Sequence, residues 1–348
     1  MIRPLTLLLA LLAAPPLYAE PEALADYGSG PTRLLVQGAA DITSFGPVMQ
    51  AFTDLNPAYA VRLEQWNTNA LHAVASADCR DGDFDADLVV SSAVDLQTWL
   101  VNQGCAQPHT SALTATLPPG RIWRDELFGL TAEPAVIVYN RRLVPEAEAP
   151  TSRFQLLDLM RAPGKRYLGR IATYDIERSG VGYLFAFTDS VQASTFGNLI
   201  EAMGANGAVA TCCSAEIIAG VAEGRWLIAY NVLGSYALPQ ADRNPDLAII
   251  APEDYTLMLS RAALIPRGAA HPDGSAALLD FLLSEPGQAE LARQRLIVRM
   301  GEDGDIQLRG QSAASIRPIE LSPVLLLGLD RQRREGFLTS WRAAFAPR

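Results

Sequence analysis

The sequence predicts an α/β protein in which strands and helices alternate along the chain. From residue 34 onward, short apolar segments typical of buried strands are followed by segments with helical spacing of apolar residues. This alternation is typical of a largely parallel sheet covered by helices. Of the 348 residues, 49% are hydrophobic and 19% are charged, which excludes a disordered chain and a long coiled coil. A chain of this length can bury several cores, so we expect two domains.

The first third of the chain is predicted to form one α/β unit. Gly38–Asp41 makes a turn between the first strand and the first helix, and Pro57 ends that helix because proline cannot continue it. The expected strands are 34–37, 60–64 and 87–91, and the expected helices are 42–56, 69–77 and 94–102.

The segment 129–140 is long and β-rich, and such a strand can run between two domains. Beyond it the expected strands are 169–173, 225–230, 248–251 and 257–260, and the expected helices are 154–160, one that opens at Ser179, and 214–223. Helices dominate from Pro272 onward. The pattern therefore predicts two α/β lobes with more than one crossover, and ligands of such sheets bind at the carboxyl ends of the strands.

Residues 1–19 have the pattern of a signal peptide. Arg3 supplies a positive charge, Leu5–Ala14 is an apolar run too short to span a bilayer, and Ala19 offers a small residue for cleavage. A buried N-terminal helix is the alternative, but the run has no amphipathic period. We therefore expect export to the periplasm.

The charge balance and the missing motifs exclude several function classes. The formal net charge is −10, and an acidic surface repels nucleic acid. Only three histidines occur, so we expect no metal site and no cofactor. No G-x-S-x-G or H-E-x-x-H motif is present, which disfavours the alternative of a secreted hydrolase. We expect a protein that is not an enzyme.

The four cysteines fall into two pairs. Cys79 and Cys105 flank one strand–helix unit, and export permits disulfides, so we expect these two to be bonded; two separate buried thiols are the alternative. For the adjacent Cys212 and Cys213, three states are open: a vicinal disulfide, a soft-metal thiolate pair, and two inert thiols.

Four segments carry a resemblance to a known family: Leu127–Asn140, Gly169–Asp175, Ala229–Tyr236 and Phe281–Gln288. Together they resemble periplasmic solute-binding proteins of ABC importers, in the class that includes ferric-ion, sugar-phosphate and phosphonate binders. The helix end Phe281-Leu-Leu-Ser-Glu-Pro-Gly-Gln288 is the most specific of them. The tail at 325–345 is similar to that of solute-binding proteins encoded beside two-component sensors.

The resemblance implies a type II periplasmic binding fold, with two lobes that close on a ligand around crossover strands. It places lobe 1 at 20–131 and 258–310, lobe 2 at 132–257, and a C-terminal helical tail at 311–348. The expected partners are a small anionic ligand and either the membrane permease of an importer or a sensor kinase. The protein is expected to be a monomer.

The resemblance also implies an anion site. Ser179, Gly180 and Val181 match a Ser-Gly-Ala sequence that binds anions at a helix N-terminus, where amides are unpaired and the helix dipole is positive. A simple N-cap is the alternative for Ser179. Ser44 and Ser92 follow strands of lobe 1 and offer hydroxyl donors, or are solvated loop residues.

Other polar groups are placed at strand ends. Trp66–Asn69 can stack or hydrogen-bond a ligand, and Tyr230 and Asn231 end a strand of lobe 2. Core packing is the alternative for Tyr230. Glu133 either binds a ligand hydroxyl or ammonium group, or ties the hinge.

Ferric-ion binding is the alternative function. The iron-binding relatives use a His, a Glu and two consecutive tyrosines, and these positions match Asp41, Ser92 and Gly234–Ser235, with Tyr236 one place late. Asp41, Glu133 and Tyr236 are the remaining residue types that suit a hard cation. We therefore expect that iron does not bind tightly.

Overall fold

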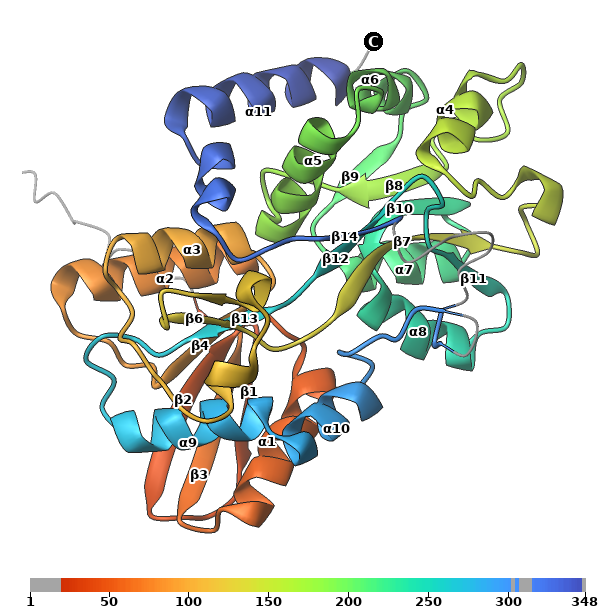
Figure 1. Cartoon of the computed structure of the whole chain (residues 1–348). Helices are drawn as coiled ribbons and strands as arrows, with labels where there is room; N and C mark the ends of the chain where they lie inside the picture. The colour runs from red at the N-terminus through yellow and green to blue at the C-terminus, as the bar shows by residue number, and fades with distance from the viewer. Residues whose placement is uncertain (1–19, 302–303, 307–314, 346–348) are drawn as a thin grey trace, which may run out of the picture.

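The computed structural model describes residues 20–301, 304–306 and 315–345 (Figure 1). The predicted signal peptide, residues 1–19, lies outside the described residues. In the described part of the chain, two mixed sheets of seven strands each form the centres of two lobes, as the α/β prediction requires. Among the described residues, no helix has the length and apolar character needed to cross a membrane.

Lobe 1 is built on the first sheet, in which β2 pairs in parallel with β3 and β4. The strand order is β1 (Ala23–Tyr27), β3 (Tyr59–Gln65), β2 (Thr32–Gly38), β4 (Leu88–Ser91), β13 (Ala262–Leu264), β6 (Leu127–Gly129) and β5 (Ile122–Trp123). Its helices are α1 (Ile42–Leu55), α2 (Thr68–Asp81), α3 (Val94–Asn102), η1 (Thr114–Thr116), η2 (Pro119–Arg121), α9 (Pro272–Leu283) and α10 (Glu285–Arg293).

Lobe 2 is built on the second sheet, whose central strand β7 is buried along its whole length. The strand order is β14 (Ile316–Pro318), β12 (Thr256–Leu259), β7 (Glu133–Asn140), β10 (Ile228–Leu233), β8 (Ile171–Tyr174) and β9 (Val209–Thr211), and β11 (Leu247–Ile250) also pairs with β7. Its helices are η3 (Glu146–Glu148), α4 (Arg153–Arg161), α5 (Gly180–Gln192), α6 (Phe196–Ala205), α7 (Ser214–Ala222) and α8 (Gly234–Arg243).

Two neighbouring segments pass between the lobes, from β6 to β7 and from β12 to β13, and the chain crosses again between α10 and β14. A buried ion pair joins the two neighbouring segments, because Arg261 Nη2 lies 3.1 Å from Glu133 Oε2 and both side chains are fully buried. Thr131 Oγ1 donates to the other oxygen of Glu133 at 2.6 Å. We propose that the lobe boundaries lie at these crossovers. Strand β12 stays in the second sheet as far as Leu259, two residues beyond the expected boundary at 257.

The C-terminal segment contacts both lobes. In the part expected to be a helical tail, β14 adds a parallel strand to β12, because Ile316–Pro318 pairs with Thr256–Met258. The chain then turns through η5 (Pro323–Gly328) beside α3, and α11 (Arg331–Phe345) packs on α6 (Figure 1). The Tyr183 hydroxyl of α5 donates to the carbonyl of Gly328 at 2.5 Å. This segment therefore links lobe 1, lobe 2 and the sheet edge.

Both cysteine pairs are bonded. The expected disulfide Cys79–Cys105 is present, and it joins the last turn of α2 to the segment after α3. Of the three states left open for Cys212 and Cys213, the structure has the vicinal disulfide.

Candidate functional site

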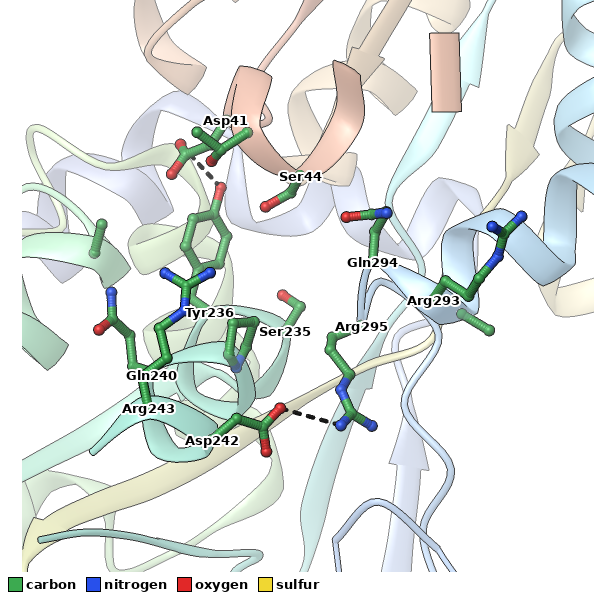
Figure 2. A pocket seen from close by; sticks show the side chains of 14 residues that line it. Asp41, Ser44, Ser235, Tyr236, Gln240, Asp242, Arg243, Arg293, Gln294 and Arg295 are labelled. Atoms are coloured by element: carbon green, nitrogen blue, oxygen red, sulfur yellow. Dashed lines mark hydrogen bonds and ion pairs between the residues drawn. The ribbon is translucent and has the colours of Figure 1, made fainter. Parts of the chain in front are cut away.

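Two adjoining cavities lie between the lobes and share Asp41, Ala215 and Tyr236. The first, called here the Ser179 cavity, has a volume of about 230 Å³. It is lined by Glu22, Ala39–Asp41, Gln65–Thr68 and Ser92 of lobe 1 and by Tyr174, Ser179, Val181, Cys212–Ala215, Leu233 and Tyr236 of lobe 2. The second, the Arg243 cavity, has a volume of about 560 Å³ and is shown in Figure 2.

The N-termini of five helices meet at the Ser179 cavity. The residue that precedes each helix lines it, namely Asp41 for α1, Asn67 for α2, Ser179 for α5, Cys213 for α7 and Leu233 for α8. In each lobe these helices follow strands whose carboxyl ends point to the same edge, so their first turns gather there. The first turn of a helix has amides without intrahelical partners and the positive end of the dipole. The cavity is therefore surrounded by positive backbone ends.

The start of α5 is in direct contact with lobe 1. The buried Ser179 hydroxyl accepts from the amide of Gly182 at 3.1 Å, and the amide of Gly180 donates across the cleft to Thr68 Oγ1 at 2.8 Å. Asn69 Nδ2 also donates across the cleft, to the carbonyl of Glu177 at 3.0 Å. The bonds of Gly180 and Asn69 therefore link the two lobes directly.

Two phenols of lobe 2 face the same cavity. The Tyr174 hydroxyl makes a short hydrogen bond to Ser214 Oγ, and burial raises the pKa of Tyr174 to about 12. The Tyr236 hydroxyl donates across the cleft to Asp41 Oδ1 at 3.3 Å, and burial also raises the pKa of Tyr236 well above its ordinary value (Figure 2). Both phenols are therefore neutral at pH 7 and carry a hydroxyl hydrogen that can be donated.

The Arg243 cavity is richer in side-chain charge. Arg243 lines it from α8, while Arg293 and Arg295 line it from the end of α10 and the turn that follows (Figure 2). Arg295 is neutralised by ion pairs with Asp242 at 3.1 Å and Asp305 at 2.7 Å. This cavity adds cationic groups at the side of the cleft where α8 approaches α1 and α10.

The structure places several of the residues predicted to bind a ligand at the cleft. Ser92, Ser179 and Val181 line the Ser179 cavity, and Ser44 lines the Arg243 cavity. Gly180 lies beside them at the contact between the lobes. A Cβ atom there would come within 3.0 Å of Ala93 Cβ and of Asn69 Oδ1, so a glycine allows this approach.

Tyr230 and Asn231 lie elsewhere, inside lobe 2. Both donate to Asp189 Oδ2 of α5, at 2.6 Å and 2.8 Å, and they line neither cavity of the cleft. Asn231 has a positive φ of 64°, at an irregularity of β10 between Ala229 and Val232. Asn tolerates this backbone conformation, so the local strand geometry and the bond to Asp189 account for the residue.

Glu133 lies in the buried crossover between the lobes and lines neither cavity of the cleft. Its carboxylate accepts from Arg261, from Thr131 and from Ser235 Oγ within the buried crossover. Asp41 and Tyr236 meet in the cleft, whereas the Glu133 carboxylate is held in the ion pair with Arg261. Within the described residues, the group of three potential metal ligands close enough to share an ion is Cys212, Cys213 and Glu216.

Sequence reasoning missed Tyr174 and Ser214. Tyr174 is the last residue of β8, one place beyond the expected strand, and Ser214 begins the helix after β9. The rule that ligands bind at strand ends and helix starts singles out both positions. The helix start at Ser214 was expected at the right position, whereas Tyr174 needed a strand end one residue later.

Comparisons with known proteins agree with this geometry. The family model of the bacterial extracellular solute-binding protein matches residues 48–298. The crystal structure of the substrate binding protein of an ABC transporter from Agrobacterium tumefaciens is 34% identical over 93% of this chain and 98% of that chain, with a TM-score of 0.84. A search of curated proteins gives no match.

Two more distant structures share the fold. Iron-bound HitA from Pseudomonas aeruginosa is 16% identical over 90% of this chain and 99% of that chain, with a TM-score of 0.69. The periplasmic binding protein AfuA from Actinobacillus pleuropneumoniae, bound to fructose-6-phosphate, is 15% identical over 91% of this chain and 99% of that chain, with a TM-score of 0.71. The family model and the Agrobacterium tumefaciens protein together establish that this chain belongs to the bacterial extracellular solute-binding proteins of ABC transporters and has their type II periplasmic binding fold.

Proposed function

We propose that this protein captures a small organic anion, with phosphate or carboxylate groups, in the Ser179 cavity. The observation that carries the proposal is the meeting of five helix N-termini around that cavity. Amides at helix starts bind anions without a formally charged side chain. The protein works in the periplasm as a monomer, and it delivers the ligand to an importer permease or presents it to a sensor kinase.

The side-chain donors support the same ligand class. Ser92, Thr68 and the neutral phenols of Tyr174 and Tyr236 add hydroxyl groups around the amides. A charge-assisted hydrogen bond in such a closed site contributes about 1.5–3 kcal/mol. The net charge of −10 does not oppose this, because salt screens charges beyond about 8–10 Å while the amides act at contact distance.

The acidic side chains that line the Ser179 cavity set a second requirement for the chemistry of the ligand. Among the described residues that line it, the charged ones are Asp41 and Glu22. A phosphate or carboxylate group therefore belongs near the starts of α5 and α7, away from Asp41. A ligand hydroxyl or ammonium group suits the free acceptor capacity of Asp41. An organic anion with polar substituents fits both sides better than an inorganic anion does.

A thermal-shift screen tests this proposal, followed by calorimetry on the best ligand. Phosphorylated sugars, phosphonates and di- or tricarboxylates are compared with neutral sugars and ferric citrate. We expect organic anions to stabilise the protein. Ser179→Ala should weaken that binding about tenfold, because it removes a hydroxyl and loosens the first turn of α5.

Ser152→Ala is the matched control. Ser152 is also an N-cap, for α4, where it accepts from the amide of Gln155 at 3.2 Å, and it does not line the cleft. It should leave anion affinity unchanged. Stabilisation by neutral sugars or ferric ion alone would contradict the proposal, as would equal affinity in the two serine variants.

A further inference from the structure

A third cavity lies away from the interlobe cleft, between α3, α5 and the C-terminal segment. Its volume is about 330 Å³. Figure 1 shows η5 beside α3 and α5 at this place. The walls are mostly apolar, and they include Leu184, Phe187, Val191, Ile319 and Leu325. The cavity shares none of its described lining residues with the Ser179 or Arg243 cavities.

One buried carboxyl group belongs to this apolar lining. Asp95 lies in the first turn of α3 and is only 2% exposed, and its Oδ1 atom has no hydrogen-bond partner among the described residues. Burial raises the pKa of Asp95 to about 7, although the amides of Leu96 and Asp95 and the charge of Arg334 act to lower it. Buried polar atoms are nearly always hydrogen-bonded, so the free oxygen of Asp95 calls for a donor.

The charged neighbours of Asp95 do not supply that donor. The guanidinium of Arg334, in α11, lies 5.2 Å from the centre of the Tyr183 ring. Its charge acts to lower the pKa of Asp95 through electrostatics. The hydroxyl of Tyr183, in α5, donates to the carbonyl oxygen of Gly328. His72 of α2 contacts the Trp99 ring of α3, and burial and Arg334 hold its pKa at about 4, so it is neutral at pH 7. Glu320 lines the same cavity and adds an acid, not a donor.

We propose that this cavity binds a small amphiphile with an apolar body and one cationic, hydrogen-bond-donating head group that meets Asp95. An alkylammonium ion has both parts: its chain replaces water against the apolar walls, and its ammonium group pairs with the carboxylate. A fatty acid of the same length would place a second negative charge beside the buried carboxylate of Asp95, and the two charges would repel each other.

The position of the site gives such a ligand an effect on the whole molecule. Asp95 belongs to lobe 1, Leu184–Gln192 of α5 belongs to lobe 2, and Ile319–Leu325 belongs to the C-terminal segment. A molecule bound among these three parts stabilises the arrangement in which they are close together.

Three probes with the same chain length test the inference on the purified protein: hexylammonium, hexanol and hexanoate. We expect hexylammonium to bind in calorimetry and to raise the melting temperature, while hexanol binds at least about tenfold more weakly and hexanoate does not bind. Hexylammonium affinity should fall as the pH is lowered from about 8 to about 5, because protonation of Asp95 removes the charge partner.

Two variants locate the binding. Asp95→Asn removes the negative charge and should weaken hexylammonium binding about tenfold or more, while Asp158→Asn, at an exposed position of α4, should not change it. Val324→Trp fills the cavity from a position that is 65% exposed, so it should fold normally and should also weaken binding. Equal binding of hexylammonium and hexanol, unchanged affinity in Asp95→Asn and Val324→Trp, or no binding of any probe would overturn the proposal. None of these outcomes bears on the ligand of the Ser179 cavity, which Ser179→Ala tests separately.

Discussion

Asp189 is the centre of a buried polar network in lobe 2. Its carboxylate is fully buried and accepts from Arg153 at 3.1 Å, from Tyr230 at 2.6 Å, from Asn231 at 2.8 Å and from Tyr255 at 2.8 Å. Arg153 is equally buried, and it also pairs with Asp254. The network joins α4, α5 and β10, so a single side chain fixes how these elements pack.

Replacing Asp189 by Ala should lower the free energy of unfolding by about 3–5 kcal/mol. The substitution leaves the buried Arg153 charge with one carboxylate partner, Asp254, and loss of a buried charge partner is costly. Urea denaturation followed by circular dichroism measures the loss. Asp158→Ala, at an exposed position of α4, is the control and should change stability by less than about 0.5 kcal/mol. A similar loss in both variants would argue against the network.

The same residues show which parts of the site could be predicted from sequence. Ser92 and Ser179 follow a strand end or begin a helix, and such positions depend only on local pattern. Tyr230 and Asn231 also end a predicted strand, but their partner Asp189 is 41 and 42 positions earlier in the chain. No local pattern indicates that pairing. Their assignment to a ligand therefore could not be tested without the three-dimensional arrangement.

At the scale of the element, the first turn of α5 controls how closely the lobes approach. Thr68, Asn69 and Ala93 of lobe 1 lie against Gly180, and its amide is bonded across the cleft. The glycine was predicted as a point where an anion approaches the backbone. The structure adds that lobe 1 itself approaches the backbone there.

Gly180→Ala should therefore oppose closure. Its Cβ would lie 3.0 Å from Ala93 Cβ and Asn69 Oδ1, so these lobe 1 atoms would have to move away by a few tenths of an ångström. We expect ligand affinity to fall about tenfold or more, and small-angle scattering should give a larger radius of gyration with ligand present than for the parent. Gly197→Ala in α6 is the matched control, because a Cβ there meets no atom within 4 Å. It should bind normally and be slightly more stable. Equal affinity in the two glycine variants would show that this contact does not limit closure.

At the scale of the whole molecule, the half-buried side chain of His72 makes the free energy of unfolding depend on pH. Burial and the charge of Arg334 lower the pKa of His72 to about 4, from an ordinary value of 6.5. Between these pH values the unfolded chain binds a proton at His72 that the folded chain does not bind. The folded state therefore loses stability as the pH falls through this range. Asp78 and Asp95 act in the opposite direction, because burial raises the pKa of Asp78 to about 6 and that of Asp95 to about 7.

A His72→Gln variant separates these contributions. It removes the proton uptake of the unfolded chain at this position, so the free energy of unfolding of the variant should increase relative to that of the parent as the pH falls from about 6.5 to about 4. Urea denaturation at several pH values gives the two curves. If the curves run parallel through this range, His72 is not the group responsible.

The two-lobed architecture could be predicted from the sequence more fully than the contacts of the C-terminal segment. The alternation of strands and helices predicts two α/β lobes, and the crossover at Glu133 lies in the segment expected to join them. Strand β14 was not predicted, because three residues carry too little pattern and its partner β12 lies about sixty residues earlier in the chain. The C-terminal segment therefore had to be seen in three dimensions before its contacts with both lobes could be recognised.

The pairing of all four cysteines has a practical consequence for optical work on this protein. Because no thiol is free, a cysteine introduced at one chosen position is the single site that a maleimide dye can label. Gln240 of α8 is suited to this, since it lines the Arg243 cavity opposite Ser44 of α1. A polarity-sensitive dye there would lose its water shell when the lobes come together. The labelled protein would then show ligand binding directly as a change in the fluorescence of the attached dye.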